Sequence, residues 1–114
     1  MDGIKIVEKK ISLDHLKQIA KERFGDMVKA VVDVERGIMA VGGELHADEE
    51  ALLLEQGSKQ ENLWGINLYL EKPKSEWLEF DSMINIRPGQ NNLSRSVENT
   101  EIQKAIVNVV DLLT

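Results

Sequence analysis

The segment VKAVVDVERGIMAVGGEL, residues 28–45, decides the fold because it predicts two neighbouring β-strands joined by a short turn. Apolar residues dominate 28–34 and 37–45, and the polar pair Glu35-Arg36 separates the two runs. Two such runs around two polar residues are typical of a β-hairpin. The glycines at positions 42 and 43 indicate a bulge, or a close approach of another group to the backbone.

Further strands are predicted beyond this hairpin. LWGINLYL (63–70) and WLEFDSMINI (77–86) are apolar runs on either side of a polar connector. The stretch ADEEALLLE (47–55) fits a short helix, whose acidic first turn would suit the helix dipole. It also fits a turn at 47–50 followed by a strand at 51–55. Periodicity does not assign runs this short, and the turn residues on both sides favour the strand.

Two amphipathic helices are predicted, one before and one after these strands. Residues 12–24 follow Ser12, a good N-cap, and place apolar side chains at helical spacing. Residues 100–113 begin with a capping box and carry one apolar stripe. We therefore expect residues 1–114 to form one α+β domain. In it, an N-terminal and a C-terminal helix pack on one face of an antiparallel meander of about five strands.

Alternation along the last two predicted strands places polar side chains on the sheet face away from the helices. This face is either a solvated or dimer-forming surface, as antiparallel sheets usually show, or a ligand cleft. In a cleft, Arg87 would bind a carboxylate or phosphate and Asp81 would act as a base or hydrogen-bond acceptor. The remaining polar residues, which would orient the ligand, are Asn67, Tyr69 and Asn85, with Lys29 and Asp33 if the register of the first strand agrees.

The loop RPGQNNLSRS, residues 87–96, precedes the C-terminal helix and is the second candidate site. Arg87 and Arg95, together with backbone amides at a helix N-terminus, could bind an anion. The alternative is an ordinary polar loop. No P-loop or dinucleotide-binding pattern is present.

A third candidate is a metal site at Glu44, His46 and Asp48. On an extended strand these alternate residues would share one face, and carboxylate and imidazole ligands suit Zn, Mn or Fe. The row would span roughly 13 Å along the strand, which is too long for one ion without a bend. An acidic turn that keeps the region soluble is therefore the favoured interpretation.

Composition narrows the function classes. The formal net charge is −6 and no basic footprint is evident, so duplex nucleic acid is not expected as a partner. The absence of cysteine excludes disulfides and thiolate chemistry. No apolar run is long enough for a membrane span and the N-terminus lacks a signal-like pattern, so we expect a cytoplasmic protein. No catalytic nucleophile or cofactor can be named, and whether the protein is an enzyme stays open.

Several distinctive strings, GGELHADEEALLLE (42–55), LWGIN (63–67) and FDSMINIRP (80–88), resemble those of a family of small uncharacterised prokaryotic proteins. The similarity covers nearly the whole chain, and it implies a domain of unknown function without assigning an activity. From the residues themselves we expect a non-catalytic binding or regulatory module that associates with itself, as a homodimer, or with another protein. The alternative is an enzyme or ligand-binding domain for an anionic small molecule near Arg87.

Overall fold

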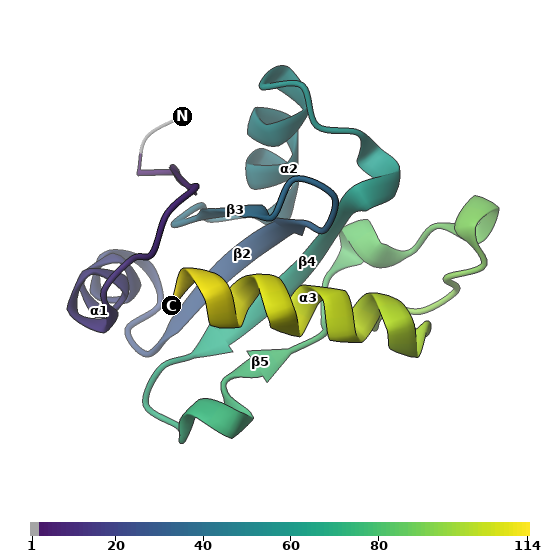
Figure 1. Cartoon of the computed structure of the whole chain (residues 1–114). Coiled ribbons are helices and arrows are strands. Elements are labelled where there is room, and N and C mark those ends of the chain that lie inside the picture. Colours follow the sequence, from purple (N-terminus) through teal and green to yellow (C-terminus); the bar gives the residue numbers. More distant parts are fainter. Residues whose placement is uncertain (1–2) are drawn as a thin grey trace.

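A computed structural model describes residues 3–114 of the protein (Figure 1). It contains a five-stranded sheet in which every neighbouring pair is antiparallel, in the order β1-β3-β2-β4-β5. The predicted α+β class, with helices near both ends of the chain, is confirmed. The strands are β1 (Lys5–Val7), β2 (Met27–Asp33), β3 (Ile38–Val41), β4 (Leu63–Tyr69) and β5 (Leu78–Glu79), and the helices are α1 (Leu13–Arg23), α2 (His46–Glu55) and α3 (Thr100–Leu113).

The predicted hairpin is confirmed as β2 and β3. Asp33 holds its turn, because its Oδ1 accepts hydrogen bonds from the backbone N–H groups of Glu35 and Arg36, each at 2.9 Å. Ser58 donates a further hydrogen bond of 2.6 Å to Oδ2 of the same carboxylate. The side chain of Asp33 therefore ties the turn to the chain that follows α2.

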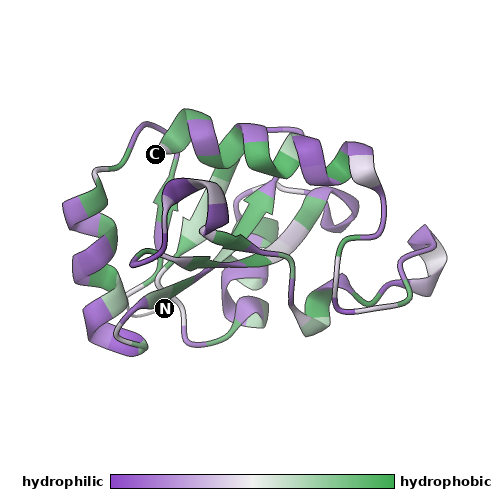
Figure 2. Cartoon of the chain, turned by 90° about the horizontal axis from the view of Figure 1, so that it is seen from below, coloured by the Kyte–Doolittle hydropathy of each residue, from purple (hydrophilic) through white to green (hydrophobic). Residues whose placement is uncertain are grey.

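Helices α1 and α3 cover one face of the sheet, where α3 lies across the strands (Figure 1). Ser12 caps α1 by accepting a hydrogen bond from the backbone of His15, and Asn99 caps α3 in the same way. Hydrophobic and hydrophilic residues alternate along α3 (Figure 2), and the buried apolar residues of both helices belong to the main core. They enclose the main core with alternate strand residues, among them Val28, Ala30, Val32, Ile66 and Leu68.

Helix α2 covers part of the opposite face, and the predicted strand at 51–55 is wrong. As a helix, the segment buries Leu53 completely against Val31, Ile38, Ala40 and Leu63. Asp48 and Glu49 lie in its first turn, near the positive end of the helix dipole. The fifth strand is instead β1, which pairs with β3. The connection through α2 crosses β2, so the sheet is not the simple meander that was expected.

The predicted strand at 77–86 pairs with β4 only at Leu78 and Glu79. Beyond these residues the chain turns, because the Ser82 hydroxyl accepts a hydrogen bond from the backbone of Ile84 and a 3-10 turn follows. Ser82 packs directly on Gly65 of β4, where a Cβ would lie 2.5 Å from the Ser82 Cβ. Glycine at position 65 therefore allows this segment to fold back over the sheet.

Candidate functional site

A cleft of about 200 Å³ opens on the sheet face that carries α2. Four parts of the chain form its walls: the first turn of α2, strands β2 and β4, the segment after β5, and the loop before α3. Its polar lining consists of Lys29, His46, Asn67, Asp81, Ser82 and Arg95, and its apolar lining of Leu45, Ala47, Met83 and Ile84.

A row of three polar residues crosses neighbouring strands, and its first two members, Lys29 and Asn67, line the cleft. Lys29 in β2 pairs in register with Asn67 in β4, which pairs with Glu79 in β5. The Asn67 amide donates to Glu79 Oε1 at 2.9 Å and, more weakly, to the carbonyl of Asp81 at 3.4 Å. Asn67 is only 6% exposed, and its Oδ1 is buried without a hydrogen-bond partner among the described residues. Such an orphaned acceptor costs about 1–3 kcal/mol.

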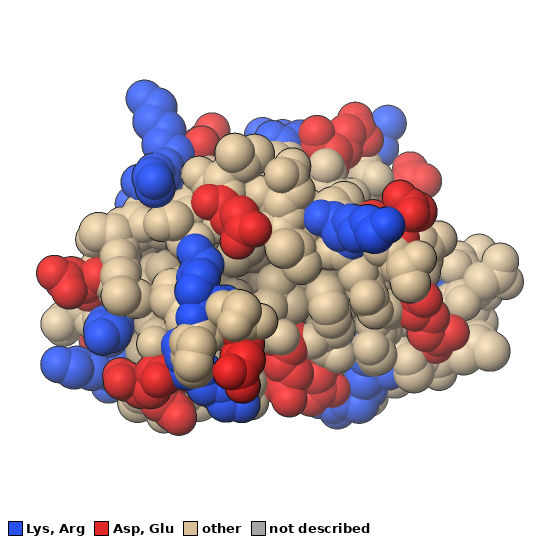
Figure 3. All heavy atoms as spheres, turned by 60° about the horizontal axis from the view of Figure 1, so that its bottom comes forward, with Lys and Arg blue, Asp and Glu red and all other residues tan. Residues whose placement is uncertain are grey.

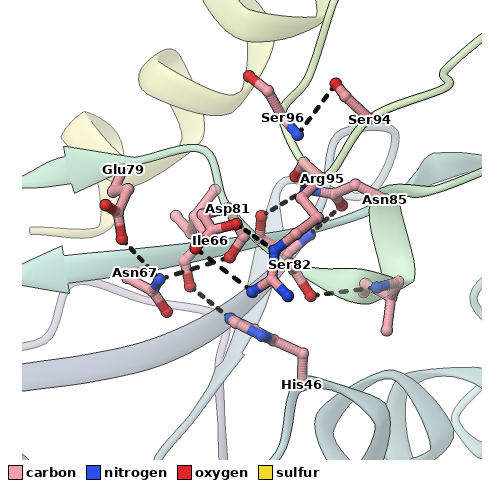
Figure 4. A network of polar contacts seen from close by, with 12 residues as sticks. His46, Ile66, Asn67, Glu79, Asp81, Ser82, Asn85, Ser94, Arg95 and Ser96 are labelled. Carbon is pink, nitrogen blue, oxygen red and sulfur yellow. Dashed lines mark hydrogen bonds and ion pairs between the residues drawn. The ribbon is translucent and has the colours of Figure 1, made fainter.

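His46 forms the wall of the cleft at the start of α2. Its Nε2 lies 2.8 Å from the carbonyl oxygen of Ile66 (Figure 4). Because a carbonyl oxygen only accepts hydrogen bonds, this contact requires a proton on Nε2. Burial lowers the pKa of His46, and the positive charges of Lys29 and Arg95 lower it further, against the opposing effect of the Ile66 carbonyl. The ring is therefore neutral at pH 7, and Nδ1 is the acceptor nitrogen in this tautomer.

Arg95 and Asp81 form the rim opposite His46, and their side chains meet above the imidazole ring (Figure 4). Arg95 Nε lies 2.6 Å from Asp81 Oδ1, and Nη2 lies 3.4 Å from Oδ2. The hydrogen bond from Arg95 lowers the pKa of Asp81. The backbone of Arg95 is held as well, because its carbonyl accepts hydrogen bonds from Ser82 N at 3.0 Å and Asn85 Nδ2 at 2.9 Å.

The structure brings together three of the ligand-binding residues expected from the sequence: Asn67, Asp81 and Arg95. Tyr69 lies at the outer edge of this group, where its hydroxyl donates to Glu79 at 3.0 Å. Asn85 lies below the cleft instead. It is fully buried, and its amide pairs with both the N–H and the carbonyl of Gly65, at 2.8 and 2.9 Å.

Arg87, the expected centre of the site, also lies elsewhere. Its guanidinium donates to the backbone carbonyls of Gln60 and Leu63 and stacks 4.1 Å from the ring centroid of Trp64. These contacts attach the 3-10 turns on either side of β4 to one another. The candidate site is therefore centred on Lys29 and Arg95.

The extended metal row of Glu44, His46 and Asp48 does not form, because α2 begins at His46. His46 turns inward and its Nε2 is engaged by Ile66, while Glu44 lies outside the helix and is exposed. Over residues 3–114, no three His, Cys, Asp or Glu side chains gather closely enough to hold a metal ion.

One buried carboxyl beside the cleft was not predicted. Glu49 faces the sheet from α2, where its Oε2 accepts a hydrogen bond of 2.9 Å from Gly43 N. Its Oε1 is buried without a partner in the described part of the chain, and burial raises the pKa of Glu49 well above the usual range. A Cβ at Gly43 would lie 2.8 Å from the Glu49 Cγ. The paired glycines were thus the sequence signal for this close approach.

Charged side chains of both signs lie on the surface. On the face shown in Figure 3, Lys and Arg side chains are interspersed with Asp and Glu. In residues 3–114 no helix is long and apolar enough to cross a membrane.

Comparison with known proteins places the chain in one family. The family described as "Protein of unknown function (DUF5674)" matches residues 5–113, so the chain belongs to it. The expected resemblance to a domain of unknown function is thereby confirmed, while the prokaryotic origin stays a prediction. No curated protein matches the chain, and no solved structure does.

Proposed function

We propose that this member of the DUF5674 family is a binding module that holds a small molecule by its anionic group in the cleft beside α2. One observation carries the proposal: Lys29, which forms no ion pair among the described residues, lines the cleft together with the first turn of α2, whose N-cap has no side-chain hydrogen bond. Asn67 and Arg95 line the same cleft.

Lys29 supplies a positive charge that is not neutralised by an ion pair. Across the described residues it pairs with no carboxylate, and its Nζ lies 5.2 Å from the centroid of the Phe24 ring. A cation that is half-buried and unpaired favours an anion beside it. Lys29 therefore supports the binding of a carboxylate or phosphate group.

The first turn of α2 reinforces this preference. Its N-cap residue is Leu45, which has no side chain that can accept a hydrogen bond from the turn. The free N–H groups of a helix N-terminus and the positive end of its dipole together favour negative charge. Because Leu45, His46 and Ala47 line the cleft, a bound anion would lie against this turn.

The test is a titration with small carboxylates and inorganic phosphate, followed by the amide NMR signals of the cleft residues. We expect shifts at Ala47 and Asn67, and a loss of affinity of about tenfold or more in Lys29→Ala and in Arg95→Ala, the usual effect of removing one charge-assisted hydrogen bond. Lys59→Ala, a change at an exposed lysine outside the cleft, is the matched control and should bind as the wild type does. Equal affinities in all three variants, or no shift at the cleft with any ligand, would overturn the proposal.

A further inference from the structure

We infer that the ligand is a small monocarboxylate with a short apolar tail, and that Asp81 selects it against anions of higher charge. This inference rests on the proposed function and adds the charge and the apolar part of the ligand. The carboxylate lies against Lys29 and the first turn of α2. The tail lies between the apolar side chains that the start of α2 and the segment after β5 contribute to the cleft.

The charged lining of the cleft carries one net positive charge. Lys29 and Arg95 are cations, Asp81 is a carboxylate, and burial lowers the pKa of His46, so its ring adds no charge at pH 7. Arg95 already donates to Asp81, with Nε 2.6 Å from Oδ1, and its charge is thereby offset (Figure 4). Lys29 is left as the cation of the lining that forms no ion pair within residues 3–114. A single unpaired cation matches an anion with a single charge.

Asp81 disfavours a ligand of higher charge. The hydrogen bond from Arg95 lowers the pKa of the Asp81 carboxyl, and the charge of Lys29 acts in the same direction, so Asp81 is ionised at pH 7. Coulomb energy is proportional to the charge of the ligand. Asp81 therefore repels a phosphate, which carries about −1.5 to −2 at pH 7, more strongly than it repels a carboxylate. A phosphate would also compete with Asp81 for Arg95.

Apolar side chains form the rest of the lining. Leu45 and Ala47 come from the start of α2, and Met83 and Ile84 come from the 3-10 turn after β5. Leu45 and Met83 are 54% and 65% exposed, so apolar surface is uncovered at this site. A tail that covers it should gain roughly fourfold in affinity for each methylene removed from water. The cleft of about 200 Å³ is smaller than the pockets of roughly 300–1,000 Å³ that hold drug-sized ligands, which limits the tail to a few carbon atoms.

The experiment compares three probes at pH 7, by calorimetry and by the amide NMR signals of the cleft residues. Isovalerate carries one charge and an isobutyl tail, acetate carries the same charge and a methyl group, and inorganic phosphate carries the higher charge. We expect isovalerate to bind more tightly than acetate and more tightly than phosphate, by about tenfold or more in each case.

Asp81→Asn tests the selection by charge. Asparagine keeps an oxygen that can accept the hydrogen bond from Arg95 but removes the negative charge. Because the lost repulsion scales with the charge of the ligand, isovalerate should gain about threefold in affinity and phosphate about tenfold. The preference for isovalerate should therefore fall about threefold. Asp14→Asn, at an exposed carboxylate of α1 outside the cleft, is the matched control and should keep the wild-type preference.

Met83→Ala tests the position of the tail. The side chain of Met83 is mostly exposed, so its truncation removes apolar surface from the cleft without opening a cavity in the core. The preference for isovalerate over acetate should fall by about threefold or more. Leu93→Ala, at a side chain that is 70% exposed and lies outside the cleft, is the control and should keep this preference.

Each contrary outcome overturns a stated claim. Phosphate binding in the cleft as tightly as isovalerate would overturn the monocarboxylate, and acetate doing so would overturn the apolar tail. Both results would leave the proposed function standing. An unchanged preference in Asp81→Asn would overturn the selection by Asp81, and an unchanged preference in Met83→Ala would overturn the position of the tail. Silence of all three probes would overturn the proposed function together with this inference.

Discussion

The two faces of the sheet differ in how completely helices cover them. Helices α1 and α3 seal one face over a continuous apolar core, which also includes Trp64 and Trp77. The other face carries α2 alone, and its apolar cluster is limited to Val31, Ile38, Ala40, Leu53 and Leu63. One short helix does not span five strands, so part of this face remains open, and the open part is the cleft.

This difference gives the two faces different roles: the sealed face stabilises the fold, and the α2 face carries the candidate binding site. On the sealed face, burial of apolar side chains stabilises the fold, although the buried Nε1 of Trp64 has no hydrogen-bond partner among the described residues. On the α2 face, Oε1 of Glu49 and Oδ1 of Asn67 are buried without partners in residues 3–114, and each such atom costs stability. We therefore expect substitutions on the two faces to affect different measurements.

The largest effect should follow from Ile106→Ala on the sealed face. Ile106 is fully buried in α3, and its truncation leaves a cavity, so the free energy of unfolding should fall by about 2–5 kcal/mol. Urea denaturation measures this loss. Val107→Ala, one position along the same helix at a residue that is 40% exposed, is the control and should cost much less. Ligand affinity should be unchanged in both variants, and a weakened cleft in Ile106→Ala would contradict the separation of the faces.

Asn85→Ala should lower both the stability of the fold and the ligand affinity, because Asn85 connects the sheet to the rim of the cleft. Its amide binds the backbone of Gly65 and the carbonyl of Arg95, and truncation leaves these buried groups unpaired. We expect a loss of about 3 kcal/mol in urea denaturation and a weaker ligand affinity in NMR titrations. Asn108→Ala, on the exposed side of α3, is the control. A loss of stability with unchanged affinity would show that Arg95 does not need this support.

The sequence predicted the parts of the fold that local pattern determines. The hairpin of β2 and β3 and the helices α1 and α3 carry their own turn residues, caps and apolar stripes. The segment 51–55 does not, and its assignment depends on which buried surface receives Leu53. That surface is formed by β2, β3 and β4, which lie outside the segment in sequence. Tertiary contacts therefore decided what periodicity could not.

The candidate site was predicted only where strand alternation held. Asn67 belongs to β4, and the register with β2 places Lys29 directly beside it, as the alternation required. Alternation fails beyond Asp81, because the chain leaves the sheet at Ser82, and Asn85 and Arg87 therefore point elsewhere. His46 enters the cleft only because α2 is a helix.

The pH dependence of stability tests the polar face directly through Glu49. Burial raises its pKa in the folded state, whereas the unfolded chain ionises near 4.5. Above pH 4.5 the unfolded state therefore binds fewer protons, so this group lowers stability as the pH rises towards the folded pKa, by at most about 1.4 kcal/mol for each pH unit. His46 acts in the opposite direction, since its lowered pKa reduces stability as the pH falls below 6.5.

Glu49→Gln isolates this contribution, because a neutral amide has no proton to lose. Urea denaturation from pH 5 to pH 8 should show the variant gaining stability relative to the wild type as the pH rises. Glu55→Gln, at an exposed carboxylate of the same helix, should follow the wild type. Parallel curves for Glu49→Gln and the wild type would mean that the Glu49 carboxyl finds solvent or a partner. In that case the α2 face would not bury a carboxyl group at the cost inferred here, and its contrast with the sealed face would rest on the cleft alone.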